Sequence, residues 1–155
     1  MRRKDRERPE AFALQILQNC EYATLATLNP DGTPYCIPLS PVLEGKSLYF
    51  HCAAEGRKLD NIRTNNRVCV SAVGRTMLQP EKYTTEYESA VAAGTASEVT
   101  DTAEKMHALR LICEKYAPTR MEDFEKAAHS SLPRTAIIRI DIETATGKEN
   151  AAPKE

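Results

Sequence analysis

Apolar and polar residues alternate along much of the chain with the period of two that is typical of strands. The first three such stretches are residues 22–28, 33–42 and 47–52. Two turn signals separate them, Asn-Pro-Asp-Gly at 29–32 and Glu-Gly-Lys at 44–46, in which Gly supplies a positive φ and Pro presets its own φ. Three strands joined by two short turns predict a meander, with strands 33–42 and 47–52 as neighbours.

Strand-like patterns return later in the chain. Residues 67–73 alternate again, and residues 84–99 form a long β-like stretch in which Gly94 indicates a bulge or bend. Residues 134–142, which read RTAIIRIDI, predict the sixth and last strand.

The period changes to that of a helix in four places. Residues 9–20, 55–65 and 121–130 are helix-like. Residues 102–116 carry the longest amphipathic stripe, and Thr102 is the expected N-cap.

Six strands joined mostly as hairpins predict a mainly β fold, an antiparallel barrel with flanking helices. A parallel α/β sheet would need a helix between most strands. The length of 155 residues is that of one domain. We expect this domain over residues 9–145, with a flexible basic tail at 1–8 and a flexible C-terminal tail at 146–155.

Composition narrows the classes of function. A formal net charge of −1 argues against a protein that coats nucleic acid, because such binding depends on an excess of basic residues. No apolar run approaches the roughly 20 residues of a membrane span. The charged first residues have no apolar stretch behind them, unlike a secretory signal. We expect a cytoplasmic protein that binds neither nucleic acid nor a membrane.

The cysteines are odd in number, widely spaced and without a CxxC pair, so they predict neither a disulfide framework nor a metal site. They are Cys20, Cys36, Cys52, Cys69 and Cys113. Packing as small buried hydrophobic residues is the expected role for most of them. A role in a site stays open for Cys36 and Cys52, although Cys52 follows His51 and should point to the opposite side of its strand.

The segment Gly56-Arg57-Lys58 directly follows a strand and begins a helix. Unpaired backbone N–H groups and the positive end of the helix dipole favour an anion at such a place. Arg57 can add a bidentate phosphate contact, Lys58 a compact charge, and Gly56 lets the backbone approach closely. The spacing matches neither a P-loop nor a dinucleotide fingerprint, and a merely solvated helix start is the alternative.

The stretch at 33–42 contains Pro34, Pro38 and Pro41. Proline cannot donate to a ladder, so this strand must be an edge, bulged or irregular one. Its exposed carbonyls are suited to face a ligand. A flat aromatic ring along it would have its phosphate at residues 56–58.

Together these stretches resemble the pyridoxamine 5′-phosphate oxidase-like, FMN-binding split β-barrel proteins. The similarity covers about residues 20–142 and is most specific in LYFHCAAEGRK and YESAVAAGTA. Within that group the chain looks most similar to the nitroimidazole-resistance flavoproteins. The resemblance implies a homodimeric, six-stranded split β-barrel with one flavin at each of two equivalent subunit interfaces.

The resemblance also implies the site residues. Backbone atoms at 36–40 contact the isoalloxazine edge, residues 50–52 lie beside the ring, and the YESAVAAGTA strand comes from the other subunit. The implied cofactor-binding residues are Ile37, Pro38, Leu39, Ser40, Phe50, His51, Cys52, Gly56, Arg57, Lys58, Asn61, Glu88 and Ser89. His51 is the implied catalytic residue, because histidine can orient a substrate or supply a proton near neutral pH. Tyr83, Thr84 and Thr85 are candidates for the substrate side.

One difference separates the chain from true pyridoxamine phosphate oxidases. Their second strand carries basic residues that hold flavin and substrate, whereas this one reads CIPLS, and a C-terminal substrate-binding segment is not evident. We therefore expect an FMN-dependent oxidoreductase that reduces a small acceptor such as a nitroimidazole or another nitroaromatic. FAD is the alternative cofactor, and NADH or NADPH the candidate electron donor. The alternative functions are a flavin- or haem-related binding or storage protein with little turnover, and a cofactor-free dimer.

Overall fold

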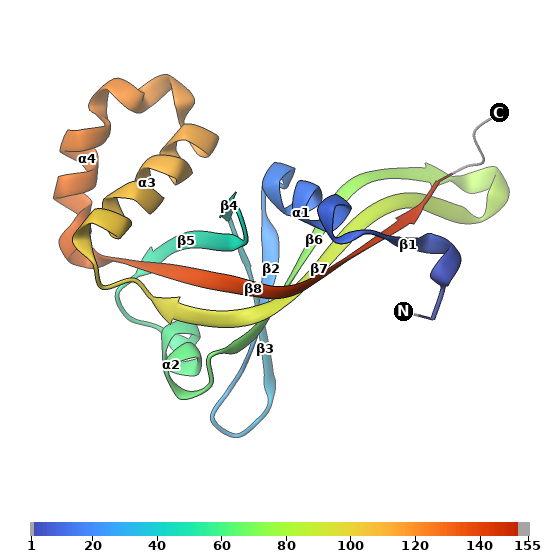
Figure 1. Ribbon diagram of the computed structural model, residues 1–155, viewed down its shortest axis with the longest axis horizontal. Coiled ribbons are helices and arrows are strands. Elements are labelled where there is room, and N and C mark those ends of the chain that lie inside the picture. Colours follow the sequence, from blue (N-terminus) through green and yellow to red (C-terminus); the bar gives the residue numbers. More distant parts are fainter. Residues whose placement is uncertain (1, 152–155) are drawn as a thin grey trace.

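The computed structural model describes residues 2–151, and within them an antiparallel sheet is combined with four α-helices (Figure 1). Its strands are β1 (Glu7–Arg8), β2 (Ala23–Leu28), β3 (Pro34–Leu39), β4 (Val42–Glu44), β5 (Ser47–Ala53), β6 (Arg67–Gln79), β7 (Thr84–Glu98) and β8 (Thr135–Asn150). Its helices are α1 (Glu10–Asn19), α2 (Arg57–Thr64), α3 (Thr102–Tyr116) and α4 (Phe124–Ser131). The mainly β fold predicted from the sequence is confirmed.

The strands follow the order β3-β2-β6-β7-β8-β5-β4, and β1 pairs with β8 outside this path. β3 and β4 stand at opposite ends of that order, although only Ser40 and Pro41 separate them in the chain. β3 pairs with β2, whereas β4 pairs with β5 across the predicted Glu-Gly-Lys turn. The sheet itself is not closed by pairing between its two ends.

The predicted single strand at 33–42 is therefore two strands, and the predicted meander is wrong, because β3 does not pair with β5. The break coincides with the missing donors, since neither Pro38 nor Pro41 has an N–H for a ladder. The prediction that this segment is an edge or irregular strand is confirmed.

β6 is longer than the predicted stretch at 67–73, whereas β7 agrees with the predicted stretch at 84–99 to within one residue, and the two strands form a ribbon that extends away from the rest of the sheet (Figure 1). Their register shifts between Val73 and Thr76. The β7–β8 register shifts between Ala93 and Gly94, so the bulge predicted there is confirmed. A Cβ at Gly94 would lie 2.1 Å from the Asp141 carbonyl oxygen, which is why only glycine fits.

Both predicted tails contain paired strands. Arg8 in β1 pairs with Gly147, and its Nε lies 2.5 Å from Glu149 Oε2. β8 accordingly continues to Asn150 and does not end at residue 142. Strand pairing thus includes residues on both sides of the range 9–145. Residues 1 and 152–155 of the predicted tails lie outside the described residues.

Two apolar clusters stabilise the fold. The larger fills the sheet's concave side with residues from α1, α2 and six strands, among them Leu25, Phe50, Leu59 and Ile138. The smaller lies between the sheet and the α3–α4 pair, which sits at one end of the molecule (Figure 1). Burial of such side chains contributes about 1.5–3 kcal/mol each.

The N-cap of α3 is Asp101, not the predicted Thr102. The Asp101 carboxylate accepts a hydrogen bond from the Glu104 N–H at 2.7 Å, which satisfies one of the first-turn donors. Among residues 2–151, no helix has the length and apolar character needed to cross a membrane.

Candidate functional site

The first turn of α2 has donors but no described side chain that caps them. Gly56 precedes the helix at φ 135° and ψ 162°, a conformation that residues with a Cβ rarely adopt. Its carbonyl accepts the N–H groups of Leu59 and Asp60. The N–H groups of Arg57 and Lys58 have no acceptor within the helix. This turn can therefore bind an anion through its backbone and the helix dipole.

The two cations of this turn flank the helix start on different sides. The Arg57 guanidinium lies 5.4 Å from the centre of the Tyr35 ring in β3. Burial raises the pKa of the Cys52 thiol at the end of β5, and Lys58 lies close enough to this thiol to oppose part of that rise. The structure thus brings the helix start together with β3 and with the end of β5, as the site prediction requires.

Tyr35 was missed by the sequence prediction. It lies partly buried under Arg57, where a ring face and a guanidinium attract one another. The sequence does contain a signal that could have indicated this residue: Tyr35 is an aromatic residue directly before Cys36 in the proline-rich strand.

Asn61 connects α2 to the β2–β3 hairpin. Its side chain is fully buried, and its Nδ2 donates to Thr27 Oγ1 at 3.0 Å and to Asn29 Oδ1 at 3.1 Å. Its Oδ1 is buried without a hydrogen-bond partner among the described residues. Such an acceptor is costly unless a donor reaches it, so this oxygen fits a hydroxyl group of a ligand or a water molecule.

An open hollow lies beside Asn61, between α2 and the turn after β2. Its lining residues are Asn29, Pro30, Asp31, Arg57, Asp60 and Asn61. Arg57 is the one cation among these lining residues, and Asp31 and Asp60 are the two carboxylates. An anion would therefore be held at the Arg57 end, next to the free N–H groups, and not in the middle of the hollow.

The predicted ring-side residues of β5 alternate between two sides. Phe50 is 1% exposed and packs in the larger core, so only its backbone can meet a ligand. Cys52 points to the same core, as predicted, and burial raises the pKa of its thiol, so it is a packing residue and not a nucleophile. His51 is exposed on the opposite side and has no described hydrogen-bond partner.

β3 presents a free edge. Ile37 and Leu39 pack partly against the core, whereas Cys36, Pro38 and Ser40 are exposed. Because β3 ends the strand order, the backbone groups of its outer edge face no other described strand. This arrangement suits contacts to a ligand through backbone atoms, as the prediction for residues 36–40 states.

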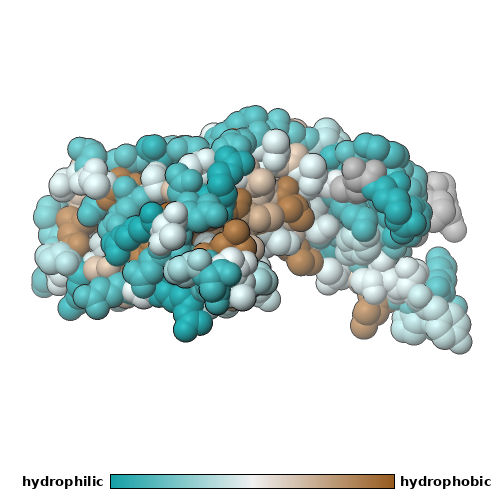
Figure 2. Space-filling model, turned by 90° about the horizontal axis from the view of Figure 1, so that it is seen from below, coloured by the Kyte–Doolittle hydropathy of each residue, from teal (hydrophilic) through white to brown (hydrophobic). Residues whose placement is uncertain are grey.

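The convex face of the sheet lacks charged residues over two complete rows. Each row crosses β3, β2, β6, β7 and β8, and the partners in a row share one face. The rows are Pro38, Thr24, Ser71, Val91 and Thr146, and Cys36, Ala26, Cys69, Ala93 and Thr144. An antiparallel sheet that faces water normally carries polar and charged residues on that side. Figure 2 shows hydrophobic residues (brown) near the middle of the molecule on the face that it views.

The predicted pair on β7 is divided between the two faces. Ser89 pairs with Val73 and belongs to the convex face beside the uncharged rows. Glu88 points to the other face, where its carboxylate accepts the Arg75 N–H at 3.2 Å. Ser89 is therefore available to a second molecule on the convex face, whereas Glu88 is engaged within its own chain.

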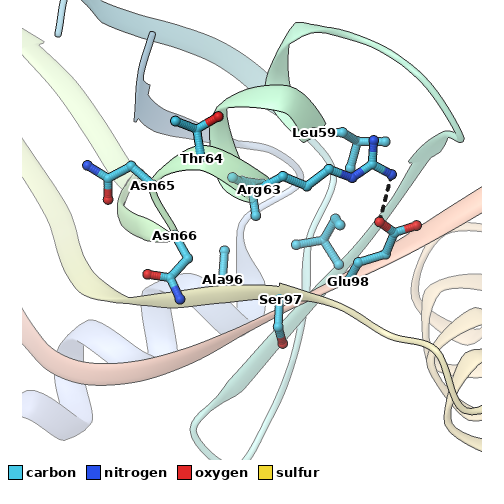
Figure 3. A pocket seen from close by; sticks show the side chains of 10 residues that line it. Leu59, Arg63, Thr64, Asn65, Asn66, Ala96, Ser97 and Glu98 are labelled. Carbon is cyan, nitrogen blue, oxygen red and sulfur yellow. Dashed lines mark hydrogen bonds and ion pairs between the residues drawn. The ribbon is translucent and has the colours of Figure 1, made fainter. Parts of the chain in front are cut away.

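A second hollow lies at the other end of α2, between its last turn and β7 (Figure 3). Arg63 reaches across its rim, and its Nη2 lies 2.8 Å from Glu98 Oε2. Arg63 is thus already paired within the chain, in contrast to Arg57. Among residues 2–151, no group of three or more His, Cys, Asp or Glu side chains could hold a metal ion.

Similar proteins of known structure share this fold. A candidate 5-nitroimidazole antibiotic resistance protein from Bacteroides thetaiotaomicron is 23% identical, with a TM-score of 0.76 over 91% of this chain and 84% of that one. An FAD- and haem-binding protein from Mycobacterium smegmatis is 20% identical, with a TM-score of 0.76 over 90% and 71%. The haem storage protein HutZ from Vibrio cholerae is 16% identical, with a TM-score of 0.68 over 92% and 95%. No curated protein matches the chain.

A family model also matches most of the chain. The pyridoxamine 5′-phosphate oxidase model matches residues 9–149, which include the α2 start, β3, β5 and the convex sheet face. The resemblance inferred from LYFHCAAEGRK and YESAVAAGTA is thereby confirmed. The chain belongs to the pyridoxamine 5′-phosphate oxidase family.

Proposed function

We propose that this protein is a flavin-dependent oxidoreductase that binds FMN at the start of α2 and passes electrons from NADH or NADPH to a small acceptor. The observation that carries the proposal is the uncapped first turn of α2, with two free N–H groups and two cations beside the free edge of β3. Family membership supports it. Bound flavin would supply the redox chemistry, and the chain would supply binding, orientation and electrostatics.

Each part of the site has a role in this proposal. Arg57 and Lys58 bind the phosphate together with their own N–H groups. Asn61 Oδ1, which is buried without a partner in the described chain, accepts a hydrogen bond from a ribityl hydroxyl. Backbone atoms at 37–40 hold the ring edge. His51, exposed on β5, orients the acceptor or supplies a proton.

We further propose a homodimer formed through the convex sheet face. The uncharged rows support it, because the cores of protein interfaces are depleted in charged residues. Ser89 lies on this face and would approach the flavin bound by the other subunit. Sedimentation equilibrium measures the mass of the protein in solution directly. A protein that stays monomeric at all micromolar concentrations would exclude this arrangement.

Titration of the purified protein with FMN tests the cofactor. We expect a yellow complex in the wild type and weaker binding in the double variant Arg57→Ala/Lys58→Ala, since each lost charge-assisted contact is worth about 1.5–3 kcal/mol. Arg63→Ala is the matched control, because this arginine of the same helix is paired with Glu98. Unchanged FMN affinity in the double variant would contradict the phosphate role, and a protein that takes up no FMN would contradict the function.

The acceptor is proposed to be a nitroaromatic compound. The similarity to the candidate nitroimidazole resistance protein supports this class. Steady-state oxidation of NADH or NADPH with a nitroimidazole as the acceptor measures it. Parallel titrations with FMN and FAD decide the cofactor, since the α2 start offers phosphate contacts to either.

A binding or storage protein is the second candidate. The similarity to the FAD- and haem-binding protein and to HutZ favours it. Bound flavin without turnover in the nicotinamide assay, or a stoichiometric haem complex seen by its Soret band, would support this function over the reductase.

A further inference from the structure

The break between β3 and β4 is held by the last turn of α3. The carbonyl oxygen of Pro41 accepts hydrogen bonds from Lys115 Nζ and from Tyr116 OH, each at 2.7 Å. Pro41 is fully buried. The two donors occupy both lone pairs of this oxygen, so its direction is fixed by two neighbouring residues of one helix.

Both side chains can donate at neutral pH. Burial raises the pKa of Tyr116 to about 12, so its hydroxyl keeps its proton. Burial lowers the pKa of Lys115, but the amine has N–H donors in either protonation state. These contacts therefore persist across the ordinary range of pH.

The same helix also contacts the far end of β4. His107 Nε2 lies 2.9 Å from Glu44 Oε2. His107 and Lys115 are separated by about 12 Å along a helix, and Pro41 and Glu44 by about 10 Å along a strand. The helix therefore matches the length of β4 and contacts it at both ends.

We propose that Lys115 and Tyr116 are positioning residues for the flavin site. By fixing the Pro41 carbonyl they hold the end of β3, because Leu39 and Ser40 directly precede it and belong to the backbone edge assigned to the ring. This inference rests on the proposed function. It assigns to the α3–α4 pair, which lies at the end of the molecule, a role in the geometry of the site.

The test uses Tyr116→Phe and Lys115→Met, each of which removes one donor and keeps most of the side-chain volume. Tyr22→Phe and Lys105→Met are the controls, since neither side chain has a described hydrogen-bond partner. Three quantities are measured: the FMN dissociation constant, the visible circular dichroism of bound flavin, and amide hydrogen exchange at Val42 and Leu43. The dichroism reports the ring's surroundings, which a purely stabilising contact would not change.

We expect each test variant to exchange faster at Val42 and Leu43, to alter the dichroism and to raise the FMN dissociation constant about 2- to 12-fold, as for one lost hydrogen bond. Faster exchange with unchanged dichroism and affinity would overturn the proposal, because the contact would then be only structural. Unchanged values throughout would overturn it as well. Failure of the wild type to bind FMN would instead refute the proposed function, and this inference with it.

Discussion

The first N–H groups of a helix have no partner within it, and the starts of α2 and α3 differ in how they meet this need. α3 begins with Asp101, whose carboxylate caps the Glu104 N–H, so negative charge stands at the positive end of the helix dipole. α2 begins with Gly56 and then Arg57 and Lys58, with no described side-chain cap. Cations at a helix N-terminus oppose the dipole. The start of α3 is thus stabilised by its own cap, whereas the start of α2 leaves N–H donors and positive charge free for an external anion.

A helix with an unfavourable start must be held by something else. α2 has Leu59, Asn61 and Ile62 buried, and the two apolar residues belong to the larger core. The difference between the helices indicates that α2 is stabilised by its packed face and α3 by both its face and its cap. Three substitutions separate these contributions.

The largest expected effect is that of Leu59→Ala. Leu59 is 1% exposed in the larger core, and removing such a side chain lowers the free energy of unfolding by about 2–5 kcal/mol. Urea unfolding followed by circular dichroism measures the change. The double variant Arg57→Ala/Lys58→Ala is the comparison, and we expect it to unfold at nearly the same urea concentration as the wild type. A loss in the double variant as large as that in Leu59→Ala would show that the first turn, and not the packed face, holds α2.

Asp101→Ala is expected to have the next largest effect. Loss of the cap should lower the free energy of unfolding by about 0.5–2 kcal/mol and leave FMN affinity unchanged. Thr102→Ala is the control, because Thr102 follows the cap and its side chain makes no described hydrogen bond. Equal losses in the two variants, measured by urea unfolding, would mean that Asp101 does not cap α3 in solution.

Local patterns predicted much of the fold, and contacts between distant segments account for what they missed. The bounds of α3 are those of the predicted helix at 102–116, because its apolar stripe and following proline are local signals. The separation of β3 from β4 and the end of β8 are not set by local patterns. The first depends on where a proline-rich strand breaks, and the second on β1 and Arg8 reaching Glu149.

The candidate site likewise has parts that local sequence patterns predict and parts that depend on contacts between distant segments. The anion site at residues 56–58 was predicted from helix-terminus physics, and the structure supplies the free donors. Tyr35 under Arg57 and the Thr27–Asn29–Asn61 contacts link the hairpin to α2, a proximity that no local pattern contains. Phe50 was predicted beside the ring, but alternation along β5 directs its side chain into the core. The roles of His51 and Ser89 stay predictions.

The smallest expected effect is also the sharpest test of the comparison. Lys58→Glu places an acid in the first turn of α2, where it should raise the free energy of unfolding by about 0.3–1 kcal/mol through the helix dipole. The same change places a negative charge beside the proposed phosphate and should weaken FMN binding. Stability and affinity are expected to change in opposite directions because one group of donors serves both. Lys105→Glu, near the start of α3, is the control and should leave FMN affinity unchanged. If Lys58→Glu left FMN affinity intact in titrations while raising stability in urea, the unfavourable start of α2 would have no binding role, and its contrast with α3 would need another explanation.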